Sequence, residues 1–426
     1  MIVDNIQHER NRAKVRRNHL KNILDWGESN DYPQSVEDIV NGSIVGSACL
    51  DIYTKFIFGI GFADKNNYQI IVNNDGETAD KLLRKVVEDF AKFGGFALHV
   101  NRNLLGQITS FVHIPMENVR LCIDDKEEYD GKVALHTDWG IRSHKRFAEE
   151  KIEYLYIYDP NIKVFRDRVA EAGGILNYKG EIYLYSNRGK NYPLPTFDAA
   201  LTAMATEEAV DNITYCNAKR GFLPAGCFAE VDEYFDANNE QDKARFEAFG
   251  DALKGMQGDK NASSIMHVIV KDKESLPQFI SMRADNYDKD YEVTRTATDL
   301  RIGKAFRQPK ELRCEDSANG FATDKMVQAY NVYNSITSYE RQVLEEQFVY
   351  LFKNWYMQIE YNFNIAPLVY GKETLIARIG ESSAKEAVSL ASNAKIPIEQ
   401  RKALLQVIFG LTEEETNMIY DYDSNH

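Results

Sequence analysis

Two stretches of helical composition enclose an insert, and this arrangement restricts the fold more than any other feature of the sequence. The first follows Pro193-Leu194-Pro195 and is rich in alanine, which favours a helix over 199–220. Glu207 and Glu208 indicate that this helix is exposed to solvent. The second covers 285–307 and stops before Pro309, because proline cannot continue a helix. An insert that leaves and returns at one place makes the two helices antiparallel, so we expect a long helical hairpin.

The insert over 221–284 has the pattern of a small acidic α/β unit. We expect strands over 228–231, 265–270 and 278–282, with a helix that begins near Asn238 or Asn239. Residues 228–260 hold nine acidic and four basic side chains, a net charge of −5. The hairpin therefore carries a compact acidic unit between its helices.

Residues 1–195 have the pattern of an α+β module. Apolar side chains at helical spacing predict helices over 35–56 and 79–93. Stretches rich in β-branched and aromatic residues predict strands over 96–100, 109–115, 154–158 and 182–185. A basic segment over 8–21 reads as a solvated arm, or else as an arm that contacts an acidic neighbour or nucleic acid.

The chain after the hairpin is predicted to be mainly helical. Residues 308–324 form a loop in which Ser317, Asn319 and Gly320 suit a mobile segment. A long helix follows over 325–357, which corresponds to roughly 50 Å. We expect a short strand over 368–370 and small helices in the tail.

The overall charge argues against a tight grip on nucleic acid. The chain has 51 Lys and Arg against 65 Asp and Glu, a formal charge of −14, whereas proteins that neutralise phosphates carry a basic face. An acidic wall still allows DNA to pass, because it repels a polyanion and prevents adhesion. The five cysteines are far apart and form no CxxC pair, which indicates a reducing compartment and neither a disulfide framework nor a zinc cluster.

No motif for catalysis, cofactor binding or membrane insertion stands out. The sequence has no Walker A phosphate loop, no GxSxG elbow and no HExxH zinc motif. The most apolar stretch, 44–62, is interrupted by Asp51 and Lys55 and makes a poor membrane span. We expect no catalytic residue, no cofactor, no metal and no membrane partner.

Several local motifs resemble those of the portal proteins of tailed bacteriophages. The segment over 191–197 (NYPLPTF) is similar to the proline-marked start of that family's first stem helix, and 217–226 (NAKRGFLPAG) to its end. Residues 302–312 (IGKAFRQPKEL) are similar to the family's I-x-x-A-F-x-x-P-x-x-L. Trp26-Gly27 with Asp31-Tyr32-Pro33, and residues 57–62, extend the likeness, which covers most of 20–360.

The resemblance implies a portal-like α+β fold. Residues 1–195 would form an N-terminal arm and α/β wing, to which a long helix over 325–365 belongs. The remaining parts would be stem helices over 196–220 and 285–307, a clip over 221–284, a tunnel loop over 308–324 and a helical crown over 366–426.

The resemblance also implies a role. A ring of about twelve copies would assemble in the host cytoplasm and occupy one capsid vertex of the virion. Double-stranded DNA would pass through it without sequence-specific contacts, during packaging and later ejection. The expected partners are the large terminase subunit, the major capsid or scaffold protein and the head–tail adaptor. The terminase, not this chain, would hydrolyse ATP.

Charge is polarised along 285–313. Asp285, Asp288, Asp290 and Glu292 come first; Arg301, Lys304, Arg307, Lys310 and Arg313 come last, and the first three of these repeat at i, i+3. Rotational symmetry would turn each into a ring of charge. One hypothesis is that acidic rings, with Glu230, Asp232 and Glu233 of the insert, keep DNA sliding while a basic ring contacts phosphates transiently. An equal alternative is that the basic side chains bridge neighbouring subunits.

Three other functions remain open at the level of sequence. The chain could be another virion component, such as an adaptor, although adaptors are shorter and lack the insert. It could be a metal-dependent nuclease that uses the carboxylates of 285–292, but these point around a helix, which favours a solvated acidic face. It could also be a bacterial scaffold protein unrelated to phage.

Overall fold

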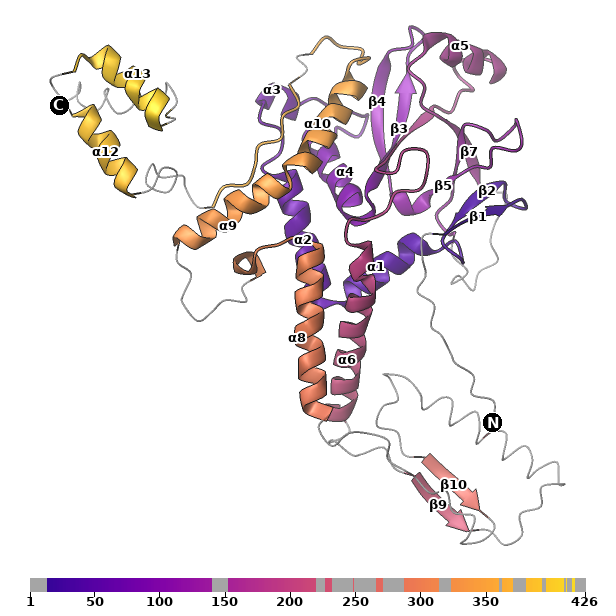
Figure 1. Ribbon diagram of the computed structural model, residues 1–426. Helices are drawn as coiled ribbons and strands as arrows, with labels where there is room; N and C mark the ends of the chain where they lie inside the picture. Colours follow the sequence, from indigo (N-terminus) through magenta and orange to yellow (C-terminus); the bar gives the residue numbers. More distant parts are fainter. Residues whose placement is uncertain are drawn as a thin grey trace.

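A six-stranded sheet forms the centre of an α+β body in the computed structural model (Figure 1). The structure describes residues 14–139, 152–219, 227–231, 248, 266–270, 287–313, 323–359, 362–370, 381–392, 396–409, 411 and 416–417. The strands lie in the order β4–β3–β8–β7–β6–β5. Their bounds are β3 Gly95–Arg102, β4 Ile108–Ile114, β5 Val119–Leu121, β6 Lys132–Leu135, β7 Glu153–Ile157 and β8 Glu181–Ser186. The expected α+β class is confirmed.

The sheet is antiparallel except at one pair of strands. β7 and β8 pair in parallel, with Tyr156 opposite Glu181. A parallel pair requires a crossover connection, and here α5 (Ile162–Glu171) provides it. The four strands predicted in this part of the chain are confirmed, whereas the shorter β5 and β6 were not predicted.

Helix α4 (Ala79–Phe93) packs against the sheet and confirms the prediction over 79–93. Thr78 caps its first turn by accepting a hydrogen bond from the backbone of Lys81 at 3.3 Å. Gly94, with φ of 80°, ends it in the left-handed region that glycine adopts without strain. The apolar face buries Leu82, Leu83, Val86, Val87 and Phe90 in the main core.

The predicted single helix over 35–56 is wrong, because two helices occupy this stretch. α1 (Tyr32–Gly42) and α2 (Ile44–Phe58) meet at Ser43, whose backbone is extended. The hydroxyl of Ser43 accepts a hydrogen bond from the backbone N–H of Gly46 at 2.8 Å and so begins α2. Apolar spacing continues across the junction, which is why periodicity alone missed it.

The N-terminal part of the body also contains a hairpin that the sequence did not predict. β1 (Val15–Asn18) and β2 (Ile23–Trp26) pair in antiparallel fashion, and β2 contacts β5. The side chain of Arg120 in β5 is fully buried and donates to both the side-chain and backbone oxygens of Asn30. Burial lowers the pKa of this guanidinium to about 10. Arg120 therefore fixes the chain before α1 by hydrogen bonds.

Two helices project from the body, and we name α6 (Leu201–Lys219) and α8 (Tyr287–Ala305) the paired rods. Figure 1 shows them side by side, running away from the sheet. Phe197 contacts Phe306 at one end, and Asp211 contacts Arg295 further along. Numbers rise along one rod as they fall along the other, so the rods are antiparallel, as the sequence predicted. A short 3-10 turn, η3 (Asp198–Ala200), precedes α6, and α8 ends at Ala305 instead of the predicted 307.

The predicted continuous helix over 325–357 is also wrong. α9 (Thr323–Ile336) and α10 (Ser338–Phe352) are separated at Thr337, whose ψ is 2°. The hydroxyl of Thr337 donates to the backbone oxygen of Tyr333 at 2.9 Å, a type of side-chain hydrogen bond that bends helices. The helical region thus ends at Phe352, short of the 357 and 365 that the sequence suggested.

A buried arginine holds this junction in place. Arg341 donates to the hydroxyl of Thr337 at 2.9 Å and to the backbone oxygen of Phe56 at the end of α2 at 2.7 Å. It also donates to the backbone oxygen of Asn334 at 2.6 Å, and burial lowers the pKa of its guanidinium. The bend between α9 and α10 is therefore tied to α2.

The remaining described elements are short. In the insert, β9 (Cys227–Val231) and β10 (Met266–Val270) form a parallel pair and confirm two predicted strands. The predicted helix near Asn238 or Asn239 and the strand over 278–282 lie outside the described residues. The predicted strand over 368–370 is wrong, since these residues have no regular structure. In the tail, α12 (Glu381–Ala391) and α13 (Ile398–Phe409) share a small core with Leu411. None of the described helices has the length and apolar character that crossing a membrane demands.

Candidate functional site: the paired rods and their base

The base of the paired rods is closed by aromatic and hydrogen-bonding side chains. The rings of Phe197 and Phe306 stack with centroids 4.7 Å apart. Beside them, the buried Gln308 donates from its side-chain nitrogen to the backbone oxygen of Cys49 in α2 at 2.6 Å and to the hydroxyl of Tyr333 in α9 at 3.1 Å. The Tyr333 hydroxyl in turn donates to the backbone oxygen of Phe306 at 3.1 Å. The rods are therefore anchored to both α2 and α9.

Burial keeps the two tyrosines near this base protonated. It raises the pKa of Tyr333, so the hydroxyl remains a donor to Phe306 over the ordinary pH range. It also raises the pKa of Tyr53, whose hydroxyl donates to the carboxylate of Glu340 at 3.2 Å. These contacts explain the segment 302–312: Ile302, Phe306 and Gln308 are buried, and the charged residues between them are exposed.

The end of α8 has the geometry of a Schellman motif. The backbone N–H of Gln308 donates to Gly303 O at 3.2 Å, and that of Arg307 donates to Lys304 O at 3.1 Å. Arg307 occupies the left-handed position of the motif, with φ of 54°. Glycine is the usual residue there, so this arginine is held in a conformation that costs roughly 1 kcal/mol. Its side chain is exposed.

Gly303 leaves room for the side chain of Arg313 to lie against α8. A Cβ atom at this position would lie 1.5 Å from the Nη1 atom of Arg313, so no larger residue fits without displacing that side chain. The guanidinium of Arg313 donates to the backbone oxygen of Asp299 at 3.3 Å. Arg313 comes from the short 3-10 helix η6 (Lys310–Arg313), which is thereby fixed against α8. Its role here is to hold the chain that leaves the rod.

The predicted basic residues fall into separate groups. Arg301 and Lys304 are exposed on α8, and Lys310 is exposed on η6. Within the described part of the chain, no ion pair links these three side chains or Arg307 to a carboxylate. The expectation that Arg307 continues the i, i+3 face of Arg301 and Lys304 is wrong, because the helix ends before it. Ser317, Asn319 and Gly320 lie outside the described residues.

The predicted acidic residues are described less completely. Glu292 is exposed on α8. Asp288 and Asp290 belong to the same helix and Glu230 to β9, but their side chains are not described; Asp285, Asp232 and Glu233 lie outside the described residues. Among the residues that the structure describes, no group of three His, Cys, Asp or Glu side chains could hold a metal ion.

One acidic residue of the rods has a structural role that the sequence reasoning missed. Glu207 was expected to be exposed with Glu208, but it is 3% exposed. Its carboxylate accepts from the Ser43 hydroxyl at 2.5 Å and from the backbone N–H of Val45 at 3.1 Å. A carboxylate at the first turn of a helix stabilises the exposed N–H groups and the positive end of the helix dipole. Glu207 therefore fixes α6 to the start of α2.

These features define an α+β protein whose two-helix hairpin is anchored at its base by a buried network. No model of a known protein family matches the sequence, and no curated protein matches it.

The solved structures that are similar to this chain include three from gene transfer agent particles. One, the virion of a native gene transfer agent particle, is 13% identical with a TM-score of 0.46; the match covers 90% of this chain and 94% of that chain. A second, the neck of an empty gene transfer agent particle computed with C6 symmetry, is 12% identical with a TM-score of 0.47, over 89% and 94% of the two chains. The third, the neck of a native particle computed with C12 symmetry, is 12% identical with a TM-score of 0.45 over the same shares.

Proposed function

We propose that this chain is a portal subunit, which forms a ring at one capsid vertex of a virion and lets double-stranded DNA pass. The observation that carries the proposal is the pair of antiparallel rods that leave the body and enclose an insert. Motifs at the start of the first rod and the end of the second are those that resemble the portal family. In this function the chain itself is not an enzyme, and the terminase supplies the energy for packaging.

The surface of the rods supports assembly with further copies. Among the described side chains of 208–215 and 291–297, Val210 is the only one that is buried. Tyr215 is 63% exposed and Val293 is 68% exposed. A pair of helices with so little interior gains stability from packing against neighbours, since isolated helices are marginal in water. In a ring, each pair of rods would pack between two others.

The basic side chains at the base of the rods suit either of two roles in such a ring. Arg301, Lys304 and Arg307 are exposed and have no ion-pair partner in the described part of the chain. They would contact DNA phosphates transiently, or they would bridge to carboxylates of the next subunit. In this function, the large terminase subunit, the capsid or scaffold protein and the head–tail adaptor are the partners of the ring.

Negative-stain electron microscopy of the purified full-length chain tests ring formation. We expect annular particles with a central hole. The substitution Val293→Asp should abolish these rings, because it places a charge where the rods of neighbouring subunits would pack against one another. Leu176→Asp is the matched control, because Leu176 is 98% exposed in the body, and it should leave the rings intact. Monomers at every concentration, or rings that survive Val293→Asp, would contradict the proposal.

Packaging distinguishes the two roles of the basic residues. The double variant Lys304→Gln and Arg307→Gln is introduced into the virus, and the DNA content of the particles is measured. Reduced DNA content with intact rings supports phosphate contact, whereas loss of the rings themselves supports bridging between subunits. Lys325→Gln, on α9, is the control. Normal rings with normal DNA content would exclude both roles for these two side chains.

A further inference from the structure

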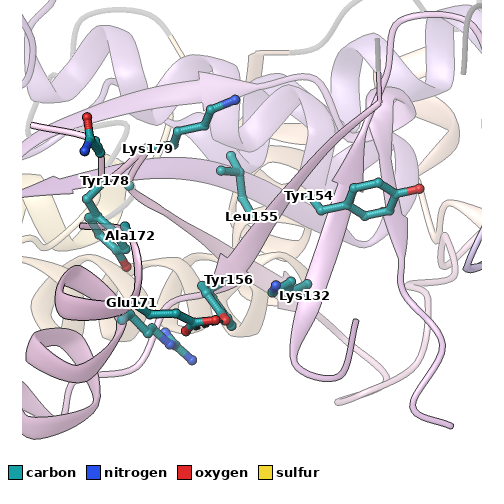
Figure 2. A pocket seen from close by; sticks show the side chains of 11 residues that line it. Lys132, Tyr154, Leu155, Tyr156, Glu171, Ala172, Tyr178 and Lys179 are labelled. Carbon is teal, nitrogen blue, oxygen red and sulfur yellow. Dashed lines mark hydrogen bonds between the residues drawn. The ribbon is translucent and has the colours of Figure 1, made fainter. Parts of the chain in front are cut away.

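A pocket of about 240 Å³ lies between β7, the end of α5 and the segment before β8 (Figure 2). Tyr154 and Tyr156 of β7 line it together with Lys132 of β6 and Lys179. The crossover from β7 to β8 creates the pocket, because α5 covers the sheet through Phe165 and leaves the space beside its last turn open. None of the predicted functional residues lies here.

The lining of the pocket is basic although the chain as a whole is acidic. The lining contains Lys132, Arg168 and Lys179 but a single carboxylate, that of Glu171. The Nζ atom of Lys132 lies 4.4 Å from the centroid of the Tyr156 ring and makes no ion pair with any described residue. Lys179 makes a 3.3 Å ion pair with Glu153, but both side chains are more than half exposed, so this pair is easily exchanged.

The arginine of the pocket is already engaged. Arg168 donates to the buried carboxylate of Glu181 at 2.6 Å and to the backbone oxygen of Ile157 at 3.0 Å. Both bonds come from its Nη1 atom, so the positive charge of Arg168 is already paired with the buried carboxylate of Glu181. The two lysines and the hydroxyl of Tyr156 remain as the groups that can hold an anion.

Glu171 shows which anion these groups accept. Its carboxylate accepts a hydrogen bond from the Tyr156 hydroxyl at 3.0 Å, and Figure 2 shows it beside Tyr156 and Lys132. Glu171 is the last residue of α5, where the negative end of the helix dipole disfavours a carboxylate. The side chain is exposed and can leave without breaking the core. A carboxylate from outside, free of this repulsion, would bind the same groups more favourably.

We propose that this pocket binds an acidic side chain of another protein segment, whose carboxylate replaces that of Glu171 on the Tyr156 hydroxyl and pairs with Lys132. The volume favours a single side chain, since pockets for whole small-molecule ligands usually measure about 300–1,000 Å³. The net positive lining gives such a segment a local attraction on a surface that otherwise repels acidic partners. The site is distinct from the paired rods and does not depend on ring formation.

The test uses the full-length chain and a fluorescein-labelled, amidated peptide of alternating glutamate and serine, followed by fluorescence anisotropy. A peptide with glutamine in place of glutamate is the ligand control. We expect Lys132→Gln to weaken binding about fivefold, since it removes a partly exposed charge contact. Glu171→Gln should tighten binding about threefold, because it removes the competing carboxylate. Lys163→Gln, on the exposed first turn of α5, should leave binding unchanged.

A misfolded variant would only lose affinity for the peptide, so opposite changes of affinity in Lys132→Gln and Glu171→Gln indicate recognition at this pocket. Thermal unfolding of each variant verifies that the fold persists. The proposal is overturned if the two variants change affinity in the same direction, or if Lys132→Gln and Lys163→Gln act alike. It is also overturned if orthophosphate or a DNA oligonucleotide displaces the peptide at lower concentration than free acidic peptide does. The site would then recognise phosphate.

Discussion

The ring of Phe197 stacks on the ring of Phe306, with centroids 4.7 Å apart and planes inclined by 22°. Phe197 precedes the first rod and Phe306 follows the second, so this stack closes the hairpin at the point where it meets the body. Both rings are buried, and Ile302 packs in the same core. The orientation of the projecting helices thus depends on a contact between residues more than a hundred positions apart.

Phe306→Ala should destabilise the chain by about 3–5 kcal/mol, because it removes a buried ring and leaves a cavity beside Phe197. The measurement is the free energy of unfolding from urea denaturation. Tyr215→Ala is the control at the far end of the rods. It removes an aromatic ring that is 63% exposed, and we expect a change within about 0.5 kcal/mol. Equal effects of the two variants would contradict the role assigned to the stack.

Arg307→Gly should stabilise the chain by roughly 0.5–1 kcal/mol, because glycine adopts the left-handed conformation at this helix end without the strain that arginine carries. Arg301→Gly provides a control with the same chemical change inside α8. There glycine should destabilise by about 1 kcal/mol, since it lowers helix propensity. Chemical denaturation of both variants measures whether each substitution raises or lowers the free energy of unfolding. Destabilisation by Arg307→Gly would show that the arginine side chain contributes more than its backbone strain costs.

Glu207→Ala should destabilise the chain by about 1–3 kcal/mol. It leaves the buried Ser43 hydroxyl and the partly buried Val45 N–H, which donate to this carboxylate, without their acceptor. Glu208→Ala, one residue further along and exposed, should change stability by less than about 0.5 kcal/mol. Thermal unfolding of the two variants tests this prediction. Equal losses of stability in Glu207→Ala and Glu208→Ala would contradict it.

We expect the carboxyl group of Asp80 to make the folding stability of the chain depend on pH. Burial raises the pKa of this carboxyl above its ordinary value of 3.8, although the backbone N–H of Phe62 donates to it at 3.1 Å. The folded chain therefore binds this proton more tightly than the unfolded chain. The stability associated with the proton is present below pH 3.8 and is lost as pH rises through the higher folded-state pKa.

Asp80→Asn removes this contribution. The unfolding free energy of the unchanged chain minus that of the variant should decrease as pH rises from 3.8. Urea denaturation at several pH values measures both free energies. Asp51→Asn is the control, because Asp51 lies on the exposed side of α2. A difference between the two chains that grows with pH would contradict a raised pKa of Asp80 in the folded chain.

Several features were predictable because they depend on neighbours in the sequence. The helix over 79–93 has a Thr cap, an apolar stripe and a terminal glycine, and it forms with those bounds. The paired rods were predicted from prolines and composition, and the strands predicted over 228–231 and 265–270 form over 227–231 and 266–270. Each of these signals acts within a few residues, so the sequence contains it in full.

The errors arose where a distant residue decides the local structure. The break at Ser43 is fixed by Glu207 in the first rod, and the bend at Thr337 is tied through Arg341 to Phe56 at the end of α2. The left-handed Arg307 contradicts the preference for glycine, and the neighbouring Gln308 is held by Cys49 and Tyr333. No periodicity within a segment reports such contacts.

The sequence by itself determined the α+β class, the succession of body, rod, insert and rod, and the antiparallel pairing of the rods, because propensity, proline positions and the return of the insert act along the chain. Tertiary structure alone decided which charges are buried. Glu207, Arg120 and Arg341 have the same side-chain chemistry as exposed neighbours, and their partners are brought to them by folding. The pocket around Tyr156 was decided in the same way, because it forms only when β6, β7 and α5 meet.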